Sequence, residues 1–265
     1  MYRRRMISLK TPQEIAILRE GGRRLALILK ALEAKVAPGV SSVALEMEAR
    51  ALCEQYEGVP AFMGYTPRGA NRPYPSALCL SINDQVVHGI PQEKEYIIKE
   101  GDIVTLDMGL KYKDLITDSA ITIGVGVLDI KGQKLLEAGA ACLEAAIFAA
   151  RAGAKTGDIG HACEETLGYY HKTYGFNFAE GLGGHGVGHK VHEDPFVPNF
   201  SKPNQGVVLQ EGLVIAIEPI INEKKGDIVI DDDGYTILTE DGGRSVHFEH
   251  TVVITKDGAE ILTRV

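Results

Sequence analysis

The sequence predicts an α+β fold in which helices pack outside a curved, mainly antiparallel sheet. Two helix pairs are each followed by strand-like segments, so the order along the chain is helices, strands, helices, strands. The connections between successive strands are too short for the crossovers that parallel strands need. Glu20, Gly22 and Gly58 recur as Glu137, Gly139 and Gly175 at a constant offset of 117 residues, which indicates an internal duplication.

The first helix is expected to begin at residues 11–14, "TPQE", which have the form of a capping box with proline at the first helical position. Apolar residues then recur at helical spacing until Pro38-Gly39 ends the helix. Ser41 or Ser42 can cap a second helix, which Gly58 closes.

A second helix pair is expected from about Lys131 to Ala152 and from Asp158 to Tyr174, closed by Gly175. The strand-like segments that follow the two pairs are residues 77–82, 103–110, 116–123, 213–221, 235–238 and 245–255.

No linker in the chain is long enough to separate independent domains. Residues 1–265 are therefore expected to form a single domain with an N-terminal tail at residues 1–10. The duplication divides that domain into two pseudo-symmetric halves, roughly residues 11–125 and 126–265.

Composition predicts a soluble protein of the cytoplasm. The net charge of −8 provides no broad basic field for nucleic acid, apart from the triplet Arg3 to Arg5. No apolar run is long enough to span a bilayer. The cysteines are far apart, form no CxxC pair and are typical of small buried hydrophobes in a reducing compartment; they are Cys53, Cys79, Cys142 and Cys163.

Two aspartates are expected to meet in a hairpin between residues 102 and 124. A turn centred between Tyr112 and Lys113 places Asp107 directly opposite Asp118. Cross-strand neighbours have Cβ atoms about 4.5 to 5.5 Å apart, where like charges are destabilising unless a cation neutralises them. A divalent metal would neutralise them, whereas a shifted register would leave both as solvated surface acids. The hairpin alone leaves both interpretations open.

Two glutamates favour the metal. Glu218 lies in the almost wholly apolar segment 213–221, where an unpaired carboxylate is rarely tolerated. Glu249 runs into the apolar Val252 to Ile254, although for this residue alone an edge strand facing water is favoured. Carboxylates with a single imidazole suit Mn, Fe, Co or Zn ions in a paired site, whereas a structural zinc would draw on cysteines.

Three of the eight histidines lie within residues 183–195, "GGHGVGHKVHEDP". His185 and His189 are four apart, as in the helical HExxH motif, but the surrounding glycines disfavour a helix and the glutamate is missing. In an extended segment His185 and His189 share one face, and His192 lies on the other unless a glycine bends the chain. Periodicity alone does not decide which histidine binds a metal.

Five separated motifs span nearly the whole chain: "VVHGIP" (86–91), "LDMG" to "TDSA" (106–120), the histidine loop, "IEPI" (217–220) and "FEHTVV" (248–253). Together, and in this order, they resemble the type I methionine aminopeptidases of the M24 metallopeptidase family. The resemblance implies the pita-bread fold that aminopeptidases share with creatinase, with metals between the two halves.

The resemblance also implies roles for single residues. Two divalent metal ions (Co, Mn, Fe or Zn) would be held by Asp107, Asp118, His185, Glu218 and Glu249, with Asp118 and Glu249 bridging both ions. The catalytic residues would be Glu218 as proton shuttle and two substrate-contacting histidines, His88 and His192. The methionine pocket would include Cys79, Phe62 and Tyr65, whereas His189 is expected to be an exposed loop residue.

The implied activity is removal of the N-terminal methionine from nascent proteins when the second residue is small. The enzyme is expected to be a cytoplasmic monomer whose triplet Arg3 to Arg5 could contact the ribosome. The loop at residues 62–75 is longer than is usual in the family and forms either a lid or a solvated excursion. The alternative functions are an Xaa-Pro peptidase of the same fold and a non-catalytic binding module.

Overall fold

The computed structural model describes residues 7–67 and 69–265 and confirms the α+β class. The helices in this range are α1 (Pro12–Glu33), α2 (Ser42–Gln55), α3 (Ile130–Ala149) and α4 (Thr156–Tyr174). The strands are β1 (Val59–Pro60), β2 (Cys79–Ile82), β3 (Gln85–Val87), β4 (Ile103–Tyr112), β5 (Leu115–Gly124), β6 (Asn177–Phe178), β7 (Gly183–Gly186), β8 (Glu193–Pro198), β9 (Val214–Ile217), β10 (Ile220–Asn222), β11 (Ile228–Ile230), β12 (Ile237–Thr239), β13 (Ser245–His247), β14 (Glu249–Thr255) and β15 (Gly258–Ile261).

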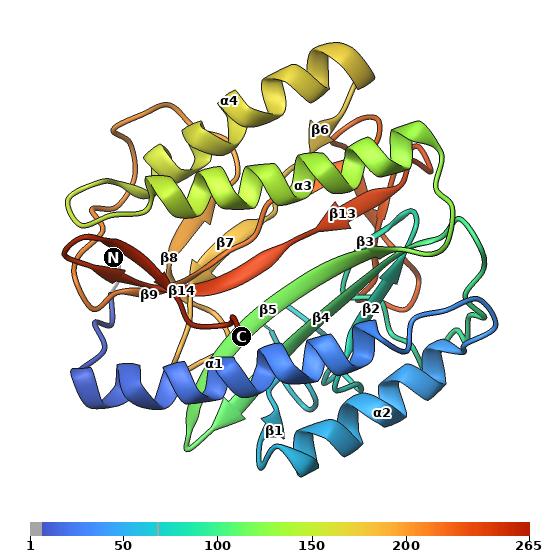
Figure 1. Ribbon diagram of the computed structural model, residues 1–265, viewed down its shortest axis with the longest axis horizontal. Helices are drawn as coiled ribbons and strands as arrows, with labels where there is room; N and C mark the ends of the chain where they lie inside the picture. The colour runs from blue at the N-terminus through green and yellow to red at the C-terminus, as the bar shows by residue number, and fades with distance from the viewer. Residues whose placement is uncertain (1–6, 68) are drawn as a thin grey trace.

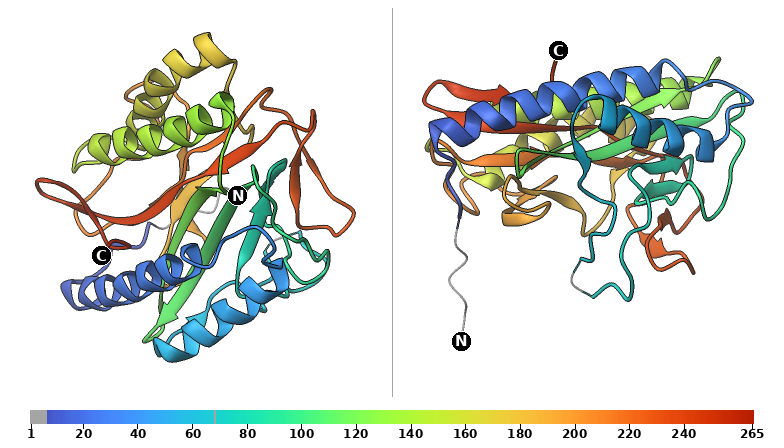
Figure 2. Two further views of the ribbon diagram at one scale, coloured as in Figure 1. Left: turned by 45° about the vertical axis from the view of Figure 1, so that its right-hand side comes forward. Right: turned by 90° about the horizontal axis from the view of Figure 1, so that it is seen from below.

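Within the described residues, a nine-stranded sheet carries the order β1-β4-β5-β14-β9-β7-β8, with β2 also paired to β4 and β15 also paired to β14. Two small sheets accompany it, β13-β10-β6 and β11-β12-β3. The pairings are antiparallel, as predicted. Helices α1 and α2 lie over one half of the main sheet and α3 and α4 over the other (Figure 1), while long loops project from its opposite side (Figure 2).

The helix ends follow their capping residues. Thr11 is the N-cap of α1, and Thr11 and Glu14 form the predicted capping box. Ser41, rather than Ser42, caps α2. The expectation that Gly58 closes α2 is wrong, because the left-handed residue after that helix is Glu57, with φ of 52°. Gly175 closes α4 in the left-handed conformation, as predicted.

The predicted register of the central hairpin is wrong by two residues. Lys113 and Asp114 both have positive φ, and they form a two-residue turn that pairs Tyr112 with Leu115. Such turns usually contain glycine or asparagine, so the Lys-Asp pair gave no signal. Asp118 consequently stands opposite Gly109. Because the slip is two residues rather than one, the aspartates of β4 and β5 still share a face.

Two predicted strands are each divided in the structure. The segment 213–221 becomes β9 in the main sheet and β10 in a small sheet, with Glu218 and Pro219 between them. Proline has no N–H to donate to a ladder, which accounts for the interruption. The segment 245–255 is likewise divided at Phe248 into β13 and β14.

Each helix pair covers its own hydrophobic core. One core lies beneath α1 and α2, where Leu25 and Cys53 are fully or almost fully buried, and another beneath α3 and α4, around Leu135 and Cys142. Full burial of one such aliphatic side chain contributes about 1.5 to 3 kcal/mol. All four cysteines are buried and unbridged, as the sequence predicts. Among the described residues, no helix combines the length and apolar character needed to cross a membrane.

We expect Gly22→Ala to destabilise the fold. Gly22 faces the C-terminal segment, and a Cβ placed there would lie 2.3 Å from the carbonyl oxygen of Leu262, a backbone atom that cannot rotate away. Such overpacking typically costs about 1 to 3 kcal/mol. Urea unfolding should show a lower midpoint for this variant.

The matched control is Gly168→Ala in α4. Apart from the adjacent residues and backbone of the helix itself, no heavy atom of the described residues lies within 4 Å of a methyl group added there, so the gain in helix propensity should raise stability by about 0.5 to 1 kcal/mol. Equal midpoints for the two variants would contradict the close packing of α1.

Candidate active site

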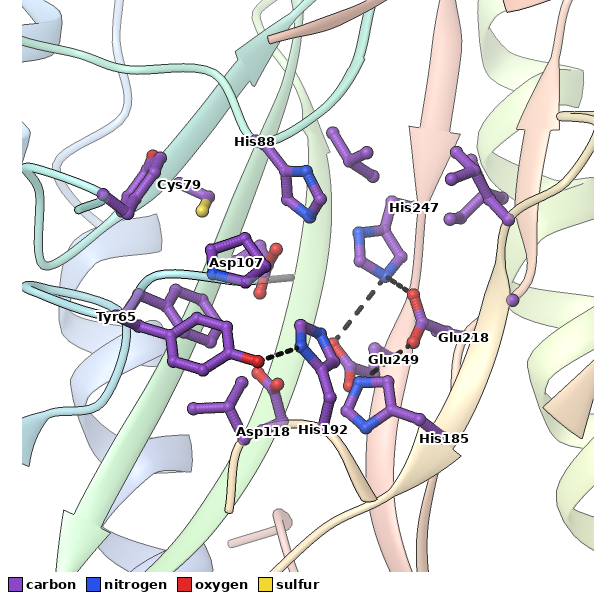
Figure 3. Close-up of a pocket in the computed structure, with 18 of the residues that line it drawn as sticks. Tyr65, Cys79, His88, Asp107, Asp118, His185, His192, Glu218, His247 and Glu249 are labelled. Atoms are coloured by element: carbon purple, nitrogen blue, oxygen red, sulfur yellow. Dashed lines mark hydrogen bonds and ion pairs between the residues drawn. The ribbon is translucent and has the colours of Figure 1, made fainter. Parts of the chain in front are cut away.

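Five neighbouring strands of the main sheet each bring one candidate ligand to the same pocket. In sheet order, β4 carries Asp107, β5 carries Asp118, β14 begins with Glu249, Glu218 directly follows β9, and β7 carries His185. Ala120 of β5 pairs with Asp107 of β4 on one side and with Glu249 of β14 on the other. Asp118 lies on β5, two residues before Ala120. Alternation along strands therefore directs the three carboxylates to one face (Figure 3).

Side-chain hydrogen bonds hold these strands together at the ligands themselves. The Thr251 hydroxyl accepts from the backbone N–H of Asp118 and donates to its carbonyl, at 2.8 and 2.7 Å. The Ser119 hydroxyl donates to the carbonyl of Glu249 at 2.8 Å. The Asn199 amide donates to the carbonyl of Glu218 at 3.0 Å, which fixes the residue at the end of β9. The carboxylates are thus mounted on a rigid backbone.

Burial makes this cluster of carboxylates unfavourable as anions. It raises the pKa of Asp118 to about 7, and burial followed by repulsion from Asp118 raises the pKa of Asp107 well above its usual value. The pKa values of Glu218 and Glu249 are raised for the same two reasons. The Glu249 side chain is only 2% exposed, so the interpretation of an edge strand facing water is wrong.

The donor atoms fit divalent metal ions. Oxygens of Asp118 and Glu249 and a nitrogen of His185 all lie within 4.8 Å of one another. Among the described residues, one buried carboxylate oxygen each of Asp107, Asp118 and Glu249 has no hydrogen-bond partner. Cations would supply both the missing partners and the missing charge. Carboxylates with imidazole suit borderline divalent transition metals.

Cys79 also lines the pocket. Burial, followed by repulsion from Asp107, raises the pKa of its thiol well above the usual value. Among the described residues, Cys79 is not in the group of donors that lie within 4.8 Å of one another, which consists of Asp118, His185 and Glu249.

The histidine loop brings His185 and His192 together, with ring centroids 4.5 Å apart, and leaves His189 outside. The exception stated for an extended segment applies, because the chain bends at Gly188, where φ is +140°, and His185 and His189 do not share a face. His189 bonds to Glu14 and Ser8 with its side chain 43% exposed. It is the loop residue that the sequence suggests.

Glycines let β7 approach its neighbours more closely than other residues would allow. A Cβ on Gly184 would lie 2.2 Å from the carbonyl oxygen of Ala216 in β9. One on Gly186 would lie 2.3 Å from that of Asp194 in β8. The carbonyl of Gly186 also orients a candidate ligand, because it accepts a hydrogen bond from His185 Nδ1 at 2.9 Å. A carbonyl can only accept, so Nδ1 carries the proton and Nε2 keeps a lone pair for a metal.

The proposed substrate residues line the same cavity of about 290 Å³; they are Phe62, Tyr65, Cys79, His88 and His192. The Tyr65 hydroxyl lies 3.0 Å from His192 Nδ1. Burial lowers the pKa of His192, and burial followed by repulsion from His192 lowers the pKa of His88 to about 4. Both imidazoles are therefore neutral near pH 7. His88 has φ of 60°, an uncommon backbone conformation of the kind found at functional sites.

The long loop at residues 62–75 forms a wall of the cavity. Tyr74 stacks edge-on against Tyr235 with ring centroids 5.2 Å apart, and both line the pocket. The Tyr235 hydroxyl donates to the carbonyl of Arg72, whose guanidinium pairs with Glu93. The loop is consequently fastened at its C-terminal end rather than being a solvated excursion. Arg68, within the same loop, lies outside the described residues.

His247 belongs to the pocket, although the sequence analysis missed it. It is the last residue of β13, is 2% exposed, and lies near Glu218 and Glu249 (Figure 3). Its spacing of two residues from Glu249 was the available signal, because alternate residues of extended backbone share a face.

Comparisons with known proteins identify the family of this chain. The model of metallopeptidase family M24 matches residues 16–256. The chain belongs to this family. A curated methionine aminopeptidase from Aquifex aeolicus is 46% identical over 97% of this chain and 98% of that protein. The crystal structure of a methionine aminopeptidase from Thermotoga maritima is 39% identical and matches with a TM-score of 0.92, covering 98% of this chain and 100% of that one.

These relatives confirm the resemblance stated from the sequence, including the pita-bread fold. A prolidase from Pyrococcus horikoshii is also similar, with 24% identity and a TM-score of 0.73, covering 97% of this chain and 63% of that one. That likeness is one of fold. Membership in M24 makes this chain a metallopeptidase, a hydrolase that uses divalent metal. The identity to methionine aminopeptidases over nearly the full length favours the aminopeptidase over the Xaa-Pro alternative.

We expect the metal-free enzyme to lose stability as the pH rises from 6 to 8. Asp118 has a pKa of about 7 in the fold, above the value of about 3.9 in an unfolded chain, so only the folded state holds this proton through that window. Loss of the proton should reduce the unfolding free energy by about 1 kcal/mol. The loss of stability can be measured by thermal unfolding of chelator-treated protein at pH 6 and at pH 8.

The control is Asp118→Asn, which has no proton to lose and should show a flatter profile. Carboxylates with lowered pKa, such as Glu14 and Glu20 at about 2, titrate below this window. The pKa values of Asp107, Glu218 and Glu249 are also raised, so these residues account for any slope that remains in the variant. An unchanged slope in the variant would remove Asp118 as the titrating group.

Proposed function

We propose that the chain is a dinuclear methionine aminopeptidase that removes the N-terminal methionine from nascent proteins when the second residue is small. The observation that supports the proposal is the set of five candidate ligands, four on neighbouring strands and Glu218 directly after a fifth, in a mostly apolar pocket. The names of the full-length relatives support the substrate.

In this proposal, two ions from among Co, Mn, Fe and Zn would be held by Asp107, Asp118, His185, Glu218 and Glu249, and Asp118 and Glu249 would serve both. When bound, divalent cations supply Lewis acidity, which polarises a peptide carbonyl and makes water a nucleophile near neutral pH. Glu218 is the proposed proton shuttle; burial, followed by repulsion from Asp118 and Asp107, raises its pKa well above the usual value, which favours a carboxyl group that can take up a proton.

The pocket histidines act on the substrate. If the Tyr65 hydroxyl donates to His192 Nδ1, the proton of the neutral ring lies on Nε2, which can then donate to the oxyanion that develops at the scissile carbonyl. His88, on the opposite wall, orients the scissile amide. Phe62, Tyr65 and Cys79 supply an apolar surface for the methionine side chain.

The wider setting is proposed as follows. Residues 1–265 act as one catalytic domain with halves of roughly 11–125 and 126–265, in a cytoplasmic monomer that acts on emerging N-termini. Arg3 to Arg5, which would contact the ribosome, lie outside the described residues. A salt-sensitive co-sedimentation with ribosomes that is unchanged by removal of this triplet would reject that contact.

A peptide panel tests the activity. Mn- or Co-loaded enzyme should release methionine from Met-Ala-Ser but not from Met-Lys-Ser, and should leave Leu-Ala-Ser and Ala-Pro peptides intact. Asp107→Asn should abolish release, since it removes a metal ligand. Cleavage of Ala-Pro would move the assignment to proline-specific peptidases, and metal binding without any cleavage would favour a binding module.

We expect His192→Ala to keep both metals and to lose roughly a hundredfold or more in turnover, because loss of one oxyanion donor costs about 3 kcal/mol of barrier. Metal content by atomic emission and turnover on Met-Ala-Ser measure this. His189→Ala is the matched control: its ring lies outside the pocket, and turnover should stay near the wild-type value. Retained metals with normal turnover in His192→Ala would remove His192 from the mechanism.

A further inference from the structure

His247 is a buried imidazole without a hydrogen-bond partner for its ring. Among the residues that the structure describes, neither Nδ1 nor Nε2 makes a hydrogen bond. The backbone is firmly held, because the Thr122 hydroxyl donates to the carbonyl of His247 at 2.7 Å and accepts from its N–H at 3.0 Å. Buried polar atoms are rarely left unpaired unless a ligand completes them. The fixed backbone therefore positions the ring with both nitrogens available to a ligand that is not part of the protein.

The ring points at two of the proposed metal ligands. His247 Nε2 lies 3.5 Å from an oxygen of Glu218 and 3.7 Å from an oxygen of Glu249 (Figure 3). These separations exceed the 2.7 to 3.2 Å that N–H···O hydrogen bonds span. They are close to the distance of about 3.4 Å between two donors that bind one ion at about 2.1 Å with tetrahedral angles.

His185, one of the five candidate ligands, lies at a similar distance from Glu218. His185 Nε2, whose lone pair is free, lies 3.4 Å from the other oxygen of Glu218. The two imidazoles thus flank one carboxylate, each at the separation expected of donors that share an ion. Asp107, at the opposite end of the cluster, has carboxylates rather than imidazoles as its neighbours among the ligand set.

We propose that His247 is a sixth protein ligand of the metal centre and binds, through Nε2, a divalent transition metal at Glu218 and Glu249. The inference rests on the proposed dinuclear site and deepens it. Two imidazoles at this end make the two metal positions unequal. The position at Glu218 favours borderline ions such as Co and Zn, whereas the position at Asp107 depends on hard oxygens alone.

Proton NMR of the Co(II)-loaded enzyme in water counts the ligating imidazoles, because each carries an N–H that the paramagnetic ion shifts far from the diamagnetic range. Wild-type enzyme should show two such exchangeable resonances, from His185 and His247. His247→Gln, which keeps a polar side chain of similar reach, should show one. Calorimetric titration should show the Co(II) dissociation constant rising about tenfold or more.

His192→Gln is the control, since this ring also lies in the pocket and packs against His185. In the described part of the chain, the imidazoles that form ion pairs with Glu218 and Glu249 are those of His185 and His247. The His192→Gln variant should keep both shifted resonances. The wild-type count is itself decisive should His247→Gln fail to fold.

A single shifted resonance in the wild type, unchanged in His247→Gln, would overturn the proposal even if metal affinity fell. Removal of a residue that only supports a ligand also weakens binding by about 10 to 100-fold, so affinity alone does not discriminate. Failure of the wild type to bind Co(II) at all would instead refute the proposed dinuclear function, so the two failures are distinguishable.

Discussion

Mutual repulsion among four buried carboxylates is the constraint on which this structure depends. Each buried, unpaired charge costs several kcal/mol. A whole domain is stable by only about 5 to 15 kcal/mol. The acids nevertheless cannot move apart, because each is attached to a different strand of one hydrogen-bonded sheet, and Thr251 and Ser119 tie the strands at the ligands. The carboxylate cluster is therefore stable only when cations or protons neutralise it. The two hydrophobic cores beneath the helices stabilise the fold against the remaining repulsion.

The site lies where the sheets part. The chain passes from β9 of the main sheet to β10 of a small sheet at Glu218-Pro219. It passes from β13 of that small sheet back to β14 of the main sheet at Phe248. Alternation continues through the second break: His247 and Glu249 face the pocket, while Phe248 packs against Gly139 of α3 on the helix side. A residue at the end of a strand is no longer hydrogen-bonded to neighbouring strands on both sides. Its carboxylate nevertheless stays shielded from water. This location combines rigid attachment with an open side from which a substrate can enter.

The sequence predicted those parts of the fold that depend on local chemistry. The Thr11 capping box, the Gly175 cap and the apolar periodicity of the helices are short-range signals, and the structure confirms them. The hairpin register failed because a left-handed Lys113-Asp114 turn has no compositional marker. The contact of His185 with His192 depends on a bend at Gly188, which spacing does not show. The spacing of His247 from Glu249 could have indicated a shared face, but its approach to Glu218 depends on sheet pairing.

The candidate ligands and much of the apolar wall of the pocket come from different segments of this molecule. The candidate ligands come from strands of the main sheet, whose fold is also that of a prolidase. Much of the apolar wall comes from the loop at residues 62–75 and from Tyr235, although Cys79 of β2 stands directly opposite Asp107. That wall is fixed by contacts of Arg72 with Glu93 and Tyr235, none of which belongs to a ligand-bearing strand. We therefore expect changes in the loop to leave the positions of the carboxylates unchanged, because the sheet fixes their spacing.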